Sequence, residues 1–123
     1  MKTIYLASFL EPENHGSGRK ISIANRKPDS IEVAGAFEHF IPSDEISDTY
    51  RKKQLDSQVE ASDYFQSAFK SQLDDFFKNV NNNDDLPFED GDTLLSWERQ
   101  GNTSYRTMVA KYLKDIGYDV VLK

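Results

Sequence analysis

The residues best equipped for chemistry lie in one segment, between positions 97 and 106. They comprise an indole, a carboxylate, an amide, two hydroxyls, a phenol and a guanidinium: Trp97, Glu98, Asn102, Thr103, Ser104, Tyr105 and Arg106. Backbone amides near Asn102 and paired hydrogen bonds from Arg106 would suit a phosphate. Glu98 could accept hydrogen bonds from ribose hydroxyls, and Trp97 could stack on a base. The set predicts a site for a nucleotide-like anion.

The same residues also have a purely structural interpretation. Thr103 and Ser104 would then only cap the following helix. Glu98 would pair with a nearby arginine, and Trp97 would belong to the core. The residue types alone leave both interpretations open.

A strand and a helix must hold this segment in place. Thr93 to Trp97 is a short run of strand character that indicates a buried strand. From Thr103 to Ile116 the apolar residues fall on one helical face, and Gly117 fits the position after a helix end. A strand that leads through a polar loop into a helix start presents free backbone N–H groups to an anion.

The rest of the chain alternates between predicted strands and helices. Strands are predicted at 3–9, 19–25 and 119–122, and helices at 43–55 and 57–80. The second of these helices carries an aromatic stripe, which is more typical of a core face than of base stacking. Residues 30–42 have no clean period and indicate a short helix or an irregular apolar segment. The alternation predicts one α/β domain over residues 1–123, with a small, mostly parallel sheet flanked by helices and right-handed crossovers.

Ligands of parallel sheets bind beyond the carboxyl ends of the strands. Three segments are expected to meet there: 8–19, 25–27 and 97–106. The first two add Phe9, Arg19 and Asn25 to the candidate ligand-binding residues. Four basic residues without a neighbouring acid form either a basic patch or a solvated strand edge: Arg19, Lys20, Arg26 and Lys27.

Composition narrows the classes of function. The net charge of -6 disfavours binding to duplex nucleic acid, which depends on many phosphate contacts. The chain has no cysteine, and its two histidines lie far apart, so neither thiol chemistry nor a metal site is expected. The acidic stretch 84–92 lacks the pattern of a calcium loop and predicts a solvated connection. Without a long apolar segment or a leader, the chain is expected to be cytoplasmic and not membrane-bound.

The C-terminal half resembles small bacterial α/β domains of unknown function with a shared motif. The motif is Leu-Leu-Cys, an aromatic residue, Glu, a short loop, and Cys-His-Arg at the start of a helix. The matching residues here are Leu94, Leu95, Ser96, Trp97, Glu98, Ser104, Tyr105 and Arg106. Ile4–Ser8 and Ile21–Ala24 also look like the first two strands of that family. Because Ser96, Ser104 and Tyr105 replace both cysteines and the histidine, the resemblance implies a binder without catalytic residues.

In size and general appearance the chain is also similar to phage-encoded anti-Thoeris proteins of the first type. Those are small, cysteine-poor α/β oligomers that sequester cyclic ADP-ribose signals made by bacterial TIR enzymes. The resemblance implies a viral immune-evasion protein that binds such a nucleotide without cleaving it and needs no cofactor. It also implies a homo-oligomer in the bacterial host cell, for which the long aromatic helix is the expected interface.

Two further classes remain open. The N-terminal run Met1–Ala7 resembles that of nucleoside deoxyribosyltransferases, in which a glutamate attacks the sugar carbon. Glu98 would be that nucleophile here. A scaffold or protein inhibitor would instead use the acidic surface and leave the pocket empty.

Overall fold

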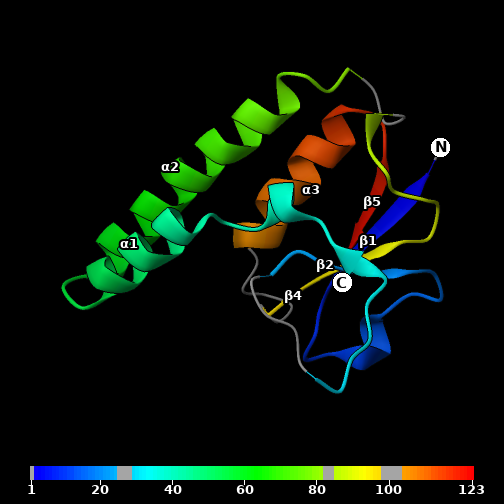
Figure 1. Ribbon diagram of the computed structural model, residues 1–123, viewed down its shortest axis with the longest axis horizontal. Coiled ribbons are helices and arrows are strands. Elements are labelled where there is room, and N and C mark those ends of the chain that lie inside the picture. The colour runs from blue at the N-terminus through cyan, green and yellow to red at the C-terminus, as the bar shows by residue number, and fades with distance from the viewer. Residues whose placement is uncertain (1, 25–28, 82–84, 98–103) are drawn as a thin grey trace.

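The computed structural model describes residues 2–24, 29–81, 85–97 and 104–123, and within them one parallel sheet with three α-helices (Figure 1). The strands are β1 Thr3–Ser8, β2 Lys20–Ser22, β3 Gly35–Ala36, β4 Thr93–Ser96 and β5 Asp119–Leu122. The helices are α1 Asp44–Gln54, α2 Gln58–Phe77 and α3 Ser104–Asp115, with short 3-10 turns η1 Pro12–Asn14 and η2 Glu38–Phe40. The order of strands across the sheet is β3-β2-β4-β1-β5, and every pair is parallel.

The predicted α/β fold is confirmed, and four of the strands lie where their patterns predicted them. The strand that the sequence did not predict is β3, which lies inside the segment 30–42. It has only two residues, whose register partners are Ile21 and Ser22 of β2. Two residues are too few to produce a period, so this strand exists through its pairing and not through its own pattern.

Right-handed crossovers determine which face of the sheet each connection covers. From β3 to β4 and from β4 to β5 the chain moves in one direction across the sheet, so their helices should share a face. From β1 to β2 and from β2 to β3 the chain moves in the opposite direction. Segment 9–19 and the described parts of segment 23–34 are therefore expected on the other face. Figure 1 shows α2 and α3 together on one side of the sheet, as this rule requires.

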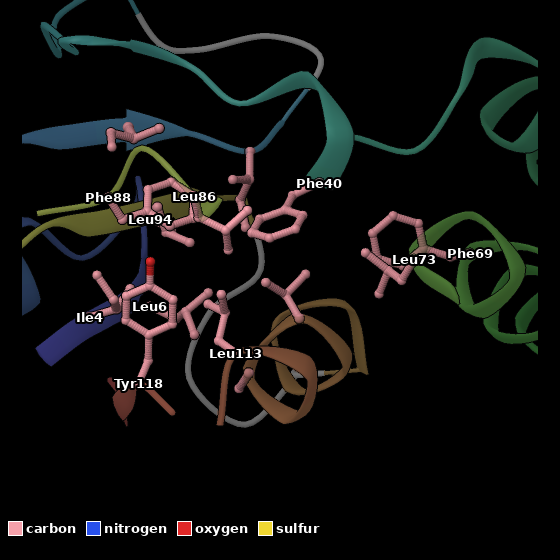
Figure 2. Close-up of a cluster of buried hydrophobic side chains, with 14 residues drawn as sticks. Ile4, Leu6, Phe40, Phe69, Leu73, Leu86, Phe88, Leu94, Leu113 and Tyr118 are labelled. Atoms are coloured by element: carbon pink, nitrogen blue, oxygen red, sulfur yellow. The ribbon is translucent and has the colours of Figure 1, made fainter. Parts of the chain in front are cut away.

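The buried side chains follow the same division. On the helix side, alternate strand residues belong to one buried cluster with residues of α2 and α3, which includes Ile4, Leu6, Leu94, Phe69, Leu73 and Leu113. Figure 2 shows Leu113 near the strand residues, whereas Phe69 and Leu73 lie farther away, beside α2. On the other side, which we call the loop side, a smaller cluster contains Ala7, Phe9 and Leu95, packed by Ile31 and Val33. The sheet therefore has a thick helical cover on one face and a thin cover of connecting segments on the other.

The long helix α2 uses its aromatic stripe as core, as predicted. Phe69 and Leu73 are fully buried within the chain itself. Ser57 caps this helix, since its hydroxyl accepts a hydrogen bond from the N–H of Glu60 at 3.3 Å. The face of α2 that carries Phe69 and Leu73 is therefore part of the chain's own core, and the oligomer interface expected on this helix stays a prediction.

The amino ends of the strands are joined by an ion pair between Arg19, whose side chain is 40% exposed, and the buried Asp92. Arg19 donates to both carboxylate oxygens of Asp92, at 3.0 and 2.7 Å, and the N–H of Glu89 donates to the same carboxylate at 2.8 Å. Asp92 is fully buried, which corrects the prediction that the whole acidic stretch 84–92 is solvated. The hydrogen bond that Arg19 donates to Asp92 raises the pKa of the Arg19 guanidinium. Gly18 permits the approach, because a Cβ there would lie 2.3 Å from the carbonyl oxygen of Gly91.

Within the described residues, none of the helices has the length and apolar character that crossing a membrane requires.

Replacing Arg19 with methionine tests the weight of this ion pair. We expect the free energy of unfolding to fall by about 2 to 4 kcal/mol, because the change leaves a buried carboxylate without its partner. Arg51→Met is the matched control, since Arg51 pairs with Asp48 on the exposed surface and its loss should cost at most about 0.5 kcal/mol. Urea denaturation followed by circular dichroism measures both. Equal losses in the two variants would contradict a structural role for Arg19.

Candidate functional site

The carboxyl ends of β1 and β4 lie side by side and form the centre of the candidate site. Ser8 and Ser96 are register partners, and the N–H of Phe9 donates to the carbonyl of Ser96 at 2.8 Å. After these residues the two strands give way to different connections, β1 to the loop side and β4 towards α3. The edge of the sheet therefore separates two groups of predicted site residues.

On the helix side, Ser96 is the strongest candidate for a ligand contact. It follows Leu94 by two positions, and because alternate residues of a strand face the same way, its side chain faces the helix side. Ser96 is fully buried, and its hydroxyl has no hydrogen-bond partner in the part of the chain that the structure describes. A buried hydroxyl without a partner costs about 1 to 3 kcal/mol, which is a reason to expect a functional role for it.

Arg106 lies in the first turn of α3 on the same side. It is fully buried, and its Nη1 donates to the main-chain oxygen of Lys123, just after β5, at 3.1 Å. The guanidinium therefore ties the start of α3 to the carboxyl end of β5, and it brings a permanent positive charge to this edge. We refer to Ser96, the first turn of α3 and Arg106 as the helix-side corner.

On the loop side, the ring of Trp97 packs against the ring of Phe9. The two ring centroids are 5.3 Å apart with an interplanar angle of 53°, and Trp97 is 42% exposed while Phe9 is buried. Beside them is a cavity of about 580 Å³, which we call the loop-side cavity. Its lining consists of Phe9, Leu10, Pro12, His15, Lys20, Ser30, Ile31, Glu32 and Trp97. Five of these nine residues are apolar and four carry polar or charged side chains, and the volume lies within the range of small-molecule sites.

His15 is a residue of this cavity that the sequence did not single out as a ligand contact. Its Nε2 lies 2.7 Å from the main-chain oxygen of Ser8. Since a carbonyl only accepts, Nε2 carries the hydrogen, and Nδ1 is the acceptor of the neutral ring. The available signal was its position in a glycine-rich loop directly after the first strand.

The structure brings together only some of the predicted site residues. Phe9, Trp97 and Arg106 lie at the carboxyl edge, whereas Arg19 lies at the opposite edge and is bound to Asp92. Arg19 therefore does not join the predicted site. Asn25, Glu98, Asn102 and Thr103 lie outside the described residues. Ser104 and Tyr105 open α3, and only their backbone is described.

Other polar groups of the described chain lie away from this edge. Between α2 and α3, burial and then a hydrogen bond to Asp74 raise the pKa of Tyr112 to about 12. A hydrogen bond from Lys70, followed by that from Tyr112, lowers the pKa of Asp74. Among the described residues there is also no group of three or more histidine, aspartate or glutamate side chains placed to hold a metal ion.

Comparison with known proteins gives no match, whether to a protein-family model, a curated protein or a solved structure. The case for a function therefore depends on the two halves of the carboxyl edge. The helix-side corner offers a hydroxyl, a helix start and a positive charge. The loop-side cavity offers an aromatic wall.

Substituting Ser96 separates a functional hydroxyl from a structural one. We expect Ser96→Ala to leave the free energy of unfolding unchanged or to raise it by up to about 1 kcal/mol, because it removes a buried hydroxyl without a partner. Ser22→Ala is the matched control. Ser22 is also buried, in a neighbouring strand, but its hydroxyl is bonded to the backbone of Ala24, so its loss should cost about 1 kcal/mol. If Ser96→Ala lowered the free energy of unfolding by more than about 1 kcal/mol in urea denaturation, the Ser96 hydroxyl would be shown to support the fold.

Proposed function

We propose that the protein binds a nucleotide-like anion at the carboxyl edge of the sheet and holds it chemically unchanged. The observation that carries this proposal is the buried hydroxyl of Ser96, which has no partner among the described residues and faces the side on which α3 begins. A phosphate oxygen placed there would accept its hydrogen bond. The same oxygen would meet the backbone N–H groups of the first helical turn and the positive end of the helix dipole.

Local charge supports an anion in spite of the acidic composition. The net charge of the chain is -6, so the overall field repels anions. Arg106 counters that field at close range, because a buried guanidinium in a poorly solvated site acts more strongly than an exposed one. Its bond to the main chain of Lys123 also keeps the charge in a fixed position.

The proposed ligand class is a cyclic ADP-ribose signal, which the resemblance to anti-Thoeris proteins suggested. Its pyrophosphate would take the helix-side corner, and its adenine would lie near Trp97 on the other side of the edge. Binding of this kind would withdraw the signal and so block Thoeris immunity in a bacterial host. Glu98 would be available to the ribose hydroxyls in this arrangement.

The positions of Ser96 and His15 support retention of the ligand without cleavage. A serine nucleophile needs a general base within hydrogen-bond reach. Ser96 faces the helix side, whereas His15 lines the loop-side cavity and donates from Nε2 to Ser8. Ser96 and His15 therefore do not form a nucleophile–base pair. The alternative class is a deoxyribosyltransferase-like enzyme with Glu98 as nucleophile, and the experiment below separates the two.

The test is recovery of the ligand. Protein incubated with cyclic ADP-ribose is desalted and heat-denatured, and the released small molecules are analysed by mass spectrometry. We expect the cyclic nucleotide unchanged. Calorimetry should show that Ser96→Ala weakens binding by about tenfold or more, the loss of one hydrogen bond to a charged group, while Ser22→Ala does not.

Cleaved nucleotide or free base among the released molecules would contradict sequestration. If that product disappeared with Glu98→Gln, the enzyme alternative would be supported. Absence of any bound nucleotide would reject this ligand class altogether.

A further inference from the structure

Binding of an anion at the helix-side corner does not by itself explain the loop-side cavity. Phosphate binding at the helix-side corner requires neither an aromatic wall nor a histidine. Nevertheless, the cavity lies directly across the edge, because Ser96 and Trp97 are consecutive residues and consecutive residues at a strand end face opposite sides. A ligand held at one side is therefore within a short reach of the other.

We propose that the loop-side cavity is a subsite for the adenine ring, with the ring stacked on Trp97 and its amino group facing His15 and Glu32. This inference rests on the proposed function and specifies its second half. Phe9 packs against Trp97 at a centroid distance of 5.3 Å and an interplanar angle of 53°, while Trp97 itself remains 42% exposed. An indole fixed in this way offers a preformed surface for a planar base.

The polar groups of the cavity favour a base that donates from an exocyclic amino group. His15 is held as the tautomer with hydrogen on Nε2, so Nδ1 of the neutral ring is an acceptor. The carboxylate of Glu32 is a second acceptor in the same lining, and Lys20 is a donor suited to a ring nitrogen. Adenine presents an amino group next to an unprotonated ring nitrogen, which matches two acceptors beside one donor. A purine with a carbonyl in place of the amino group would direct an oxygen at the acceptors instead.

The experiment uses the only tryptophan of the chain as its reporter. Adenosine, which carries no phosphate, is titrated into the full protein while Trp97 fluorescence is followed. We expect adenosine to change the emission and to protect Trp97 from quenching by acrylamide. Inosine, which has the carbonyl, should bind at least about fivefold more weakly, the loss of roughly one hydrogen bond. An unchanged emission and unchanged quenching, or equal binding of adenosine and inosine, would overturn the proposal.

Variants provide a second line of evidence. His15→Ala should weaken adenosine binding by about five- to tenfold. The control is His39→Ala, because His39 stacks on Phe76 away from this cavity and its loss should leave adenosine affinity unchanged. Thermal unfolding verifies that both variants fold. Equal adenosine affinity of His15→Ala and the parent protein would remove His15 from the site.

Inorganic pyrophosphate distinguishes this proposal from the proposed function. It carries no ring, so calorimetry with pyrophosphate reports on the helix-side corner alone. Pyrophosphate binding without adenosine binding would reject the adenine subsite and leave the anion site in place. Adenosine binding without pyrophosphate binding would reject the anion site at the helix-side corner and leave the adenine subsite in place.

Discussion

The handedness of the crossovers is the constraint on which the rest of the molecule depends. The chain crosses the sheet twice in each direction, and parallel strands joined by right-handed connections place the two directions on opposite faces. Both long connections, with α2 and α3, go to one face. Both short connections go to the other. The thick core and the thin core are therefore consequences of strand order before any side chain is considered.

This division gives the carboxyl edge its two different surfaces. Because β4 leads into α3, the helix side receives a helix start and the buried charge of Arg106. Because β1 leads into a short loop with η1, the loop side receives no α-helix among the described residues, and a cavity lies between that loop and the segment around Ile31. A ligand that used both surfaces would have to bend across the edge of the sheet. A nucleotide can do so, since a flexible sugar separates its base from its phosphates.

The sequence predicted the parts of the fold that depend on local pattern. Buried strands show continuous apolar runs, and the predicted helices 43–55 and 57–80 begin where Ser43 and Ser57 cap α1 and α2 in the structure. It did not predict what depends on pairing between distant segments. Arg19 has the composition of a basic patch, yet its partner Asp92 lies 73 positions away in the sequence. His15 was missed for the same reason, since its cavity is completed by residues from three other segments.

The two ends of the sheet differ in how their buried polar groups are hydrogen-bonded. At the amino end, Asp92 is buried with its carboxylate bonded to Arg19 and to the backbone, so this polar group is satisfied by the chain itself. At the carboxyl end, Ser96 is buried just as deeply, but its hydroxyl has no such bond among the described residues. Burial of this kind lowers stability unless something else supplies the partner. The buried carboxylate at the amino end is thus hydrogen-bonded within the chain. The buried hydroxyl at the carboxyl end can still donate a hydrogen bond, and this is the end at which parallel sheets bind their ligands.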